Sequence, residues 1–335
     1  MKDKKTMRSR KIADFSVSKI GLGCMNLSFG YGAGPGEEYG IRLLNQALDT
    51  GYTFFDTAAL YGFGENEKLV GKALRSRRDE FVLASKCGMR RNSEGVREIN
   101  GRPEVIKATC EQSLSRLGVD VIDLYYLHRC DKNVPIEESV GALSELVKEG
   151  KIRAIGLSEV SAEIIKRGNK IHQIAAVQSE YSLWTRNPEI AVLDACEEIG
   201  AAFVAFSPVG RKFLTGSLQD VSNFGDDDIR KNMPRFQPEA FEKNLELLEE
   251  FSNLAEEAGC SMAQLANAWV LAQREHIIAI PGTTSIDHMV ENFHSDDVVI
   301  SDDVMMCLDK LFTPDAAVGG RYDAAAQSTV STEDF

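Results

Sequence analysis

Hydrophobic and polar positions along the chain follow two alternating patterns. Short runs of β-branched and aromatic residues, such as 52–56 (YTFFD), 81–86 (FVLASK) and 152–158 (IRAIGLS), are each followed by a longer segment with helical periodicity. The predicted strands cover 19–23, 52–56, 81–86, 123–128, 152–158, 175–178, 201–207 and 277–282. The predicted helices cover 37–50, 65–76, 103–118, 135–150, 161–168, 188–200, 238–258, 261–273, 286–294 and 301–312.

This order of elements predicts a parallel sheet, because strands that alternate with helices pair through right-handed crossovers. Eight such units without a break in composition favour one closed (β/α)8 barrel, the TIM-barrel fold, over residues 10–312, with extra helices at its C-terminal end. The alternative is an open doubly wound sheet, which normally carries G-x-G-x-x-G after its first strand. None of GLGCMN (21–26), GYGAGP (30–35) and GFGENE (62–67) completes that spacing.

The two ends of the chain lack the apolar pattern of the barrel. Residues 1–9 are basic without a following apolar run, and we expect a flexible leader. Residues 313–335 are small and polar, and we expect a loosely docked or disordered tail.

Charge and cysteine content narrow the classes of function. The 335 residues carry a formal net charge of -13, which disfavours nucleic acid and anionic lipid as partners, so any anionic ligand needs a local positive site. Seven scattered cysteines without a C-x-x-C pair indicate reduced thiols and a cytoplasmic protein. No apolar run is long enough to cross a membrane, and we expect no membrane partner.

Polar side chains end six consecutive predicted strands: Asp56, Lys86, His128, Ser158, Gln178 and Ser207. In a barrel of this type the C-terminal strand ends meet at one mouth, where catalysis occurs. One polar strand end is ordinary, because strand ends meet water. Six that face the same mouth indicate a site.

Three of these strand-end residues suggest acid–base chemistry with a nearby tyrosine. Lys86 follows a buried strand and needs a carboxylate, which Asp56 on the neighbouring strand supplies. Tyr61 lies close in sequence, and an adjacent ammonium is expected to lower a phenol pKa from about 10, so that it acts as a general acid. His128 completes the group. A structural ion pair and packing aromatics are the alternative, and the absence of an H-x-x-x-H or Cys/His cluster argues against metal.

Asp56, Tyr61, Lys86 and His128, in this order, resemble the catalytic tetrad of the aldo-keto reductases. Further matching stretches extend the resemblance over about residues 10–312, and two of them, 178–186 and 205–216, are similar to bacterial and plant members with a long loop after strand 7. The resemblance implies NAD(P)H-dependent interconversion of a carbonyl and an alcohol without metal or flavin. Hydride passes to the carbonyl carbon, Tyr61 gives the proton with Lys86 and Asp56 behind it, and His128 orients the oxygen. It also implies a β-hairpin, at 11–15 and 17–20, that closes the barrel bottom.

The resemblance further implies a set of cofactor-binding residues. Ser158 and Gln178 hold the nicotinamide carboxamide, Phe206 stacks on the ring, and the loop with Arg211 and Lys212 covers the pyrophosphate. The full set is Gly23, Met25, Asp56, Ser158, Gln178, Phe206, Ser207, Pro208, Val209, Gly210, Arg211, Thr283, His288, Glu291 and Asn292.

Two departures from the family pattern affect the cofactor site. Glu159 stands where the family often has Asn, so either it turns away or the carboxamide depends on Ser158 and Gln178 alone. Thr284, Ser285 and His288 replace the Arg or Lys that commonly clamps the 2′-phosphate, although the helix start near Ile286 favours anions. NADP is therefore the first expectation, and NAD use stays open.

The expected substrate pocket gathers Met25, Phe29, Tyr31, Tyr61, His128 and Trp184, together with residues of 208–237. The aromatic rings favour an apolar carbonyl or alcohol as the small-molecule partner. A second hypothesis is a regulatory subunit, like the β-subunits of voltage-gated potassium channels, which share this fold. The intact tetrad and the lack of a long interaction arm favour an enzyme. A third is a barrel enzyme that acts on sugar phosphates without nicotinamide. No motif in the sequence indicates the natural substrate, the physiological direction of the reaction, or whether the protein is a monomer or a homo-oligomer.

Overall fold

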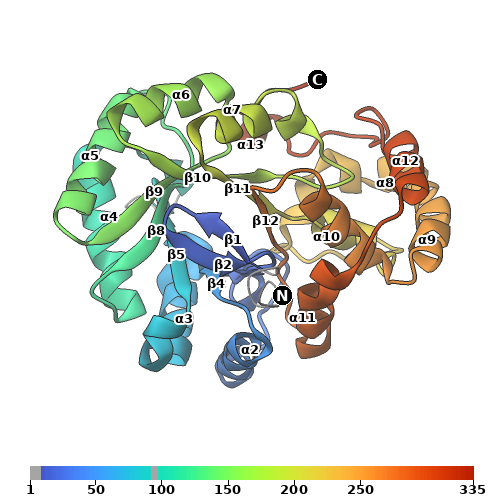
Figure 1. Ribbon diagram of the computed structural model, residues 1–335, viewed down its shortest axis with the longest axis horizontal. Helices are drawn as coiled ribbons and strands as arrows, with labels where there is room; N and C mark the ends of the chain where they lie inside the picture. Colours follow the sequence, from blue (N-terminus) through green and yellow to red (C-terminus); the bar gives the residue numbers. More distant parts are fainter. Residues whose placement is uncertain (1–8, 92–96) are drawn as a thin grey trace, which may run out of the picture.

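A ring of eight parallel strands forms the centre of the molecule (Figure 1). The computed structural model describes residues 9–91 and 97–335, so the predicted leader lies outside the described residues apart from Ser9. The strands lie in the order β12 (Ile277–Ile280), β11 (Ala202–Phe206), β10 (Ile174–Glu180), β9 (Ile152–Ser158), β8 (Ile122–Leu127), β5 (Val82–Cys87), β4 (Phe54–Asp56) and β3 (Leu22–Gly23). A parallel bridge from Ile20 to Ala279 closes the ring, which confirms the predicted barrel.

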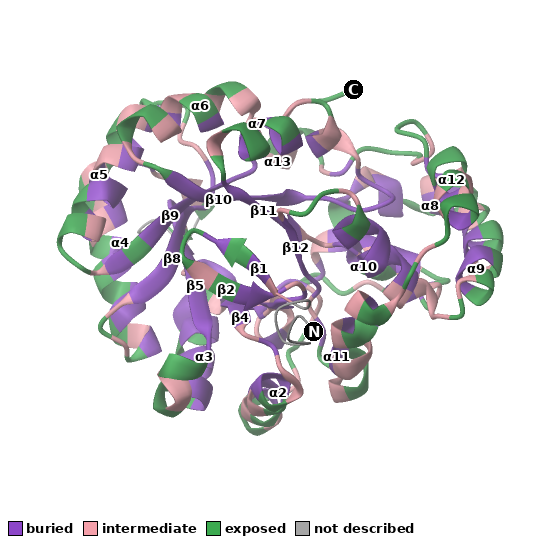
Figure 2. Cartoon of the chain, viewed as in Figure 1, coloured by how far each residue is buried: buried purple, intermediate pink, exposed green. Residues whose placement is uncertain are grey.

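Helices surround the ring on its outer side (Figure 1). They are α2 (Glu37–Thr50), α3 (Glu65–Leu74), α4 (Pro103–Leu117), α5 (Ile136–Lys148), α6 (Ala162–Ile171), α7 (Val192–Ile199), α8 (Pro238–Leu245), α9 (Leu247–Glu257), α10 (Met262–Ala272), α11 (Ile286–Phe293), α12 (Asp302–Leu311) and α13 (Ala324–Gln327). The strands of the ring are buried along most of their length, whereas the helices bury mainly their inner faces (Figure 2). The apolar alternation of the sequence therefore corresponds to a core between strands and helices, together with a second apolar cluster inside the ring.

Several predicted boundaries differ from the structure. The helix predicted at 238–258 is two helices, α8 and α9, which meet at Glu246. The helix predicted at 188–200 begins only at Val192, because a 3-10 turn over Asn187–Glu189 precedes it. An antiparallel hairpin of β6 (Met89–Arg91) and β7 (Arg97–Ile99) follows β5 and was not predicted, since neither strand has an apolar alternation.

An N-terminal hairpin fills one end of the barrel. Its strands, β1 (Ser9–Ile12) and β2 (Phe15–Ser18), lie about two residues earlier than predicted, because the turn falls at residues 13 and 14. Ile12 and Val17 are fully buried in the cluster inside the ring. Arg10 anchors the hairpin by donating to the carbonyl of Leu271 at 2.6 Å. The bottom of the barrel is thus sealed, and the opposite mouth remains for a site.

The C-terminal segment, residues 313–335, contradicts the expectation of a loose or disordered tail. Arg321 and Thr332 are buried, and the side-chain amide of Asn187 donates to Asp334 at 2.7 Å. The segment lies against the barrel near α7 in Figure 1. No helix among the described residues is both long enough and apolar enough to span a bilayer.

Candidate active site

The mouth of the barrel brings the predicted tetrad together through strand register. Asp56 ends β4 opposite Ala84 of β5, and Lys86 of β5 lies opposite Tyr126 of β8. His128 directly follows β8, and its backbone N–H donates to the carbonyl of Cys87 at 2.8 Å. Adjacent parallel strands therefore place an acid, an amine and an imidazole at one rim, where the carboxyl ends of barrel strands converge.

Lys86 is the centre of the site. Its ammonium donates to the carboxylate of Asp56, to the carbonyl of Thr57 at 2.9 Å and to the hydroxyl of Tyr61 at 3.2 Å. All three hydrogens of an ammonium are thereby used, which a fully buried lysine requires. The ring of Tyr61 meets the ring of His128 edge to face, with centroids 5.8 Å apart. The four side chains that the sequence predicted to meet do meet.

Burial and charge set the protonation states of this group. Burial alone would lower the pKa of Lys86, but the carboxylate of Asp56 and the hydroxyl of Tyr61 raise it overall, so the ammonium stays charged. Burial raises the pKa of Tyr61, and the opposing effect of Lys86 is smaller. The expectation that the ammonium lowers this phenol pKa below its usual value was therefore wrong in net direction, because desolvation of the phenolate outweighs attraction. Tyr61 is a protonated phenol at neutral pH and can donate a proton.

His128 is held neutral. Burial, followed by the nearby charges of Lys86 and Arg129, lowers its pKa well below the usual range. A neutral imidazole has one N–H donor and one acceptor. The buried Nδ1 atom of His128 has no hydrogen-bond partner in the described part of the chain.

A cavity of about 1180 Å³ opens beside the tetrad. Its wall contains Asp56, Tyr61 and His128 but not Lys86, which lies behind them. Of the predicted cofactor and substrate residues it also contains Gly23, Met25, Phe29, Tyr31, Ser158, Gln178, Phe206, Ser207, Pro208, Val209, Arg211, Thr283, His288, Glu291 and Asn292. The predicted cofactor and substrate residues thus lie around one continuous space, apart from Gly210 and Trp184.

Trp184 is predicted to contact the substrate, but the structure places it outside the cavity wall. Its ring stacks on Phe213 with centroids 3.9 Å apart and meets Phe236 edge to face. The backbone carbonyl of Trp184 accepts from Arg235. An aromatic residue in a loop gives the same sequence signal whether it lines a pocket or packs in a core.

The loop after β11 has an unusual backbone. Ser207, Gly210, Arg211 and Lys212 all have positive φ, between 51° and 81°. Side chains rarely adopt this region, and such strain is concentrated at functional sites. The guanidinium of Arg211 is not the free cation expected over a pyrophosphate, because it is buried and donates to Glu180 at 2.7 Å and to the hydroxyl of Tyr322 at 3.0 Å.

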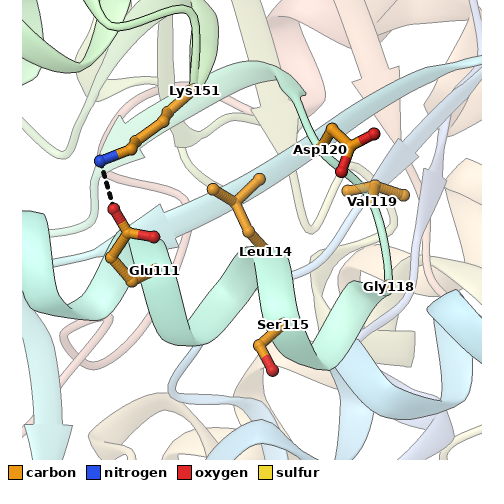
Figure 3. A pocket seen from close by; sticks show the side chains of 7 residues that line it. All are labelled: Glu111, Leu114, Ser115, Gly118, Val119, Asp120 and Lys151. Carbon is orange, nitrogen blue, oxygen red and sulfur yellow. Dashed lines mark ion pairs between the residues drawn. The ribbon is translucent and has the colours of Figure 1, made fainter.

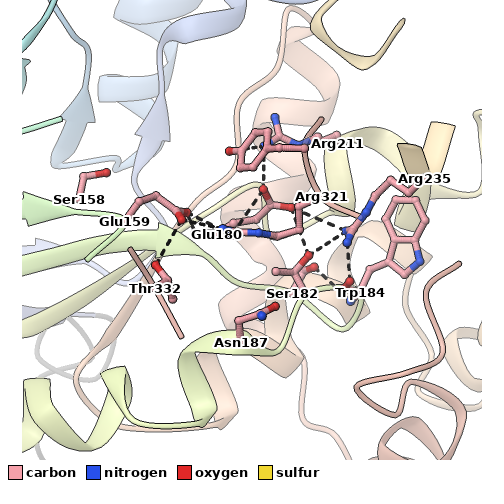
Figure 4. Close-up of polar contacts among 12 residues, drawn as sticks. Ser158, Glu159, Glu180, Ser182, Trp184, Asn187, Arg211, Arg235, Arg321 and Thr332 are labelled. Atoms are coloured by element: carbon pink, nitrogen blue, oxygen red, sulfur yellow. Dashed lines mark hydrogen bonds and ion pairs between the residues drawn. The ribbon is translucent and has the colours of Figure 1, made fainter. Parts of the chain in front are cut away.

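Glu159 turns away from the carboxamide position. Although it directly follows Ser158, its carboxylate is buried and accepts two hydrogen bonds from Arg321 of the C-terminal segment (Figure 4). The sequence left two alternatives, and the structure shows that Glu159 turns away from the carboxamide position. Ser158 accepts from Arg129 at 3.3 Å, and Gln178 uses one N–H on Asp56 at 2.8 Å, which leaves its amide oxygen and second N–H for other partners.

The residues around the cavity fit a nicotinamide dinucleotide. Its amide-bearing ring needs a donor and an acceptor, which the unspent groups of Gln178 and Ser158 provide beside the tetrad. At the other end the first turn of α11 is capped by Ser285, whose side chain accepts from the backbone of His288 at 3.3 Å. A helix N-terminus with hydroxyl and imidazole side chains suits a phosphate.

Two parts of the wall were missed by the sequence prediction. Phe63, Arg91 and Arg97 form one edge, and the two guanidinium groups lie over aromatic rings, as Arg91 does on Phe63 at 3.6 Å. Tyr322, Asp323, Ala326 and Thr329 form another edge, in a C-terminal segment whose sequence looks like an ordinary polar tail. Residues 226–230 also line the wall, and they lie within the segment 208–237 that was expected at the pocket mouth.

A second hollow of about 470 Å³ lies between α4 and the turn that precedes β8 (Figure 3). The ammonium of Lys151 in its wall is paired with Glu111. It lies at the N-terminal ends of the strands, away from the tetrad. We do not assign a function to it. Within residues 9–91 and 97–335 no group of three or more His, Cys, Asp or Glu side chains is arranged to hold a metal ion.

The closed barrel and its Tyr–Lys–Asp–His group at the mouth define a class of proteins, the barrel oxidoreductases that act on carbonyls. The chain belongs to the aldo/keto reductase family, whose model matches residues 19–312. It is 44% identical over 310 residues to a probable aldo-keto reductase 1 of Glycine max, covering 92% of this chain and 89% of that protein. It is 40% identical to the aldo-keto reductase yakc [NADP(+)] of Schizosaccharomyces pombe, covering 96% of both chains. The glycerol dehydrogenase AKR11B4 of Gluconobacter oxydans superposes with a TM-score of 0.84 at 32% identity, over 95% of this chain and 98% of that one.

Proposed function

We propose that this protein is an NADP-dependent aldo-keto reductase in which Tyr61 protonates the carbonyl oxygen as an aldehyde or ketone is reduced to an alcohol. One observation carries the proposal: the hydroxyl of Tyr61 lies 3.2 Å from the ammonium of Lys86, and Tyr61 and His128 share the cavity wall. Family membership and the printed name of the yeast relative support the reaction class and the cofactor.

The chemistry of the chain is acid catalysis and positioning. A bound reduced nicotinamide supplies the hydride. Tyr61 gives its proton to the substrate oxygen, and Lys86, fixed by Asp56, stabilises the phenolate that remains. His128, neutral and part of the cavity wall, donates to the same oxygen. Each such preorganised donor stabilises the developing oxyanion by about 3 kcal/mol.

The proposed cofactor would extend from the tetrad end of the cavity to the start of α11. Ser158 and Gln178 would hold the carboxamide, and the backbone of residues 207–212 would cover the diphosphate. Thr283, Ser285 and His288 at the start of α11 would meet the adenosine phosphate, which favours NADP. The test is the Kd of NADPH and of NADH between pH 6 and 8. A preference for NADPH that grows as pH falls supports His288 as the contact, and equal affinities at every pH contradict the assignment.

The substrate is a small carbonyl compound with apolar or aromatic character. Phe29, Tyr31 and Tyr61 supply apolar surface, and the guanidinium groups of Arg91 and Arg97 lie at the same edge. A panel of aldehydes, ketones and secondary alcohols, assayed with both cofactors, tests the proposed function. Turnover of aromatic aldehydes with NADPH supports it. Binding of NADPH without turnover of any substrate contradicts it and favours a regulatory role.

We also propose a cytoplasmic location. The seven cysteines are all free thiols, and four of them are buried in the core. Reduced thiols are typical of cytosolic proteins. Fractionation of cells that express the tagged protein tests this, and recovery in a secreted or organelle fraction contradicts it.

A further inference from the structure

An unusual group of buried charges lies next to the cavity (Figure 4). Two carboxylates, Glu159 and Glu180, lie at the ends of β9 and β10. Three guanidinium groups approach them from distant segments: Arg211 after β11, Arg235 before α8, and Arg321 in the C-terminal segment. All five side chains are at most 7% exposed. Removing so many charges from water is costly unless each one is paired and hydrogen-bonded.

Glu159 occupies the critical place in this group. It follows Ser158, which lines the cavity, and its φ of 54° lies in a region that Asn tolerates better than Glu. Its carboxylate accepts from both terminal nitrogens of Arg321, at 3.2 and 2.7 Å, and from the hydroxyl of Thr332 at 3.3 Å. The backbone N–H of Glu180 also donates to it at 2.9 Å. The backbone and four donors thus turn the acid away from the cavity.

Arg321 is the main cation that neutralises Glu159. Burial would raise the pKa of Glu159, but Arg321 and then Arg129 lower it overall. Arg129 is already engaged with the carbonyl of His128 at 2.7 Å and with Ser158 at 3.3 Å. Without Arg321, the anion next to Ser158 would compete for Arg129 and Ser158, and both of these contacts border the tetrad.

The C-terminal segment is tied to the same acid along its length. The backbone N–H of Ser331 donates to the carbonyl of Glu159 at 3.0 Å, and Tyr322, next to Arg321, forms part of the cavity wall. The hydroxyl of Tyr322 accepts from Arg211 of the loop after β11. Arg321 therefore joins the acid, the cavity wall and this loop in one contact network.

We propose that Arg321 is a positioning residue for the cofactor site: it holds Glu159 out of the cavity and cancels its charge beside Ser158, where the carboxamide is expected. The inference rests on the proposed function. Arg321 does not touch the reacting atoms and acts through Glu159. The pairing of Arg321 with Glu159 explains how this chain keeps an acid at a position where the family often has Asn.

The first test is the Kd of NADPH, measured by quenching of protein fluorescence, for three variants. Arg321→Met leaves Glu159 buried without its main cation and raises the Kd about tenfold or more. Glu159→Gln removes the charge, and its Kd stays within about threefold of the wild type. The double variant Glu159→Gln/Arg321→Met recovers affinity to within about threefold, because there is no longer an anion to cancel. Arg321→Lys falls between the wild type and Arg321→Met, since an ammonium cannot form the two-pronged contact.

A second readout separates positioning from a purely structural role. The groups that face Glu159 are Arg321, Arg129, Tyr322, the hydroxyl of Thr332 and, through its backbone, Glu180. In Arg321→Met the carboxyl pKa rises because its strongest cation is gone, so lowering the pH protonates it. The ratio of variant to wild-type Kd therefore falls from pH 8 to pH 6. The ratio for a variant that only loosens the C-terminal segment does not change with pH.

Arg167→Met is the matched control. Arg167 makes a comparable two-pronged pair with Glu137, at 2.8 and 2.9 Å, between α6 and α5 on the surface. Its NADPH affinity stays at the wild-type value.

The outcomes distinguish the inference from the proposed function. Failure of the wild type to bind NADPH refutes the function. With a wild type that binds, an unchanged Kd in Arg321→Met, or a double variant as weak as that single variant, overturns the inference. If Arg321→Met does not fold, a double variant that folds and binds supports the proposal, and one that does not fold overturns it.

Discussion

Replacing Lys86 with Met tests the buried centre of the site. The substitution keeps the length of an unbranched side chain and removes the ammonium that bridges Asp56 and Tyr61. It also removes the donor to the carbonyl of Thr57. Asp56 is then a buried carboxylate whose remaining side-chain donor is Gln178, at 2.8 Å.

The magnitude follows from these contacts. Breaking a buried ion pair by removing one partner costs about 4 kcal/mol of folding stability. For 335 residues the unfolding entropy is about 0.7 kcal/mol/K, so the melting temperature falls by about 6 °C. Catalysis falls more steeply, because loss of the neighbouring cation raises the pKa of Tyr61 further and destabilises its phenolate. We expect kcat to fall by a factor of about 10² to 10³.

The assay is thermal unfolding by circular dichroism together with steady-state reduction of an aromatic aldehyde at saturating NADPH. The double variant Lys86→Met/Asp56→Asn should regain most of the lost melting temperature, since no buried charge is left unpaired, without regaining kcat. A Lys86→Met enzyme whose kcat stays within about threefold of the wild type would refute the reasoning.

Three further predictions concern the surroundings of the site. Burial opposes ionisation of Glu180, but its three arginine neighbours lower its pKa to about 2, so its stabilisation is complete above about pH 4.5 and is lost as pH falls towards 2. Urea unfolding at pH 6 and pH 3 should show a loss of about 2 kcal/mol that Glu180→Gln lacks, and equal losses would contradict this. Trp184→Leu leaves a void beside Phe213 and lowers the free energy of unfolding by about 3 kcal/mol; KM should not change, and a raised KM would restore the pocket assignment. Asn66→Ala removes buried hydrogen bonds that tie Cys24 and Ser28, just before Phe29, to Thr57 after β4, at a cost of about 2 kcal/mol. A raised KM is expected as well, and an unchanged melting temperature would contradict the expected loss of stability.

The fold and the tetrad could be predicted because they follow local patterns. Each barrel strand is an apolar run, and the first polar residue after it lies at the mouth. This rule correctly places Asp56 and His128 at the mouth. It also places Lys86 there, although β5 extends one residue beyond Lys86. The resemblance to a family then supplied the cofactor residues, nearly all of which line the cavity.

The remaining features depend on contacts between distant segments. Arg321 contacts Glu159 across 162 residues, and nothing in its polar surroundings distinguishes a buried arginine from an exposed one. The pKa of Tyr61 depends on a competition between burial and charge that the order of residues does not reveal. The packing of Trp184 likewise depends on Phe213 and Phe236, which lie in a loop with no regular pattern.

Tyr61→Phe is the most direct test of the central claim that this phenol is the proton donor. The substitution removes one oxygen, keeps the ring that meets His128, and leaves the pair of Asp56 and Lys86 in place. The measurement is the Kd of NADPH and the single-turnover rate of aldehyde reduction in the same preparation. We predict a Kd within about threefold of the wild type and a rate lower by a factor of about 10³. A variant that binds NADPH and reduces the aldehyde at close to the wild-type rate would contradict the account.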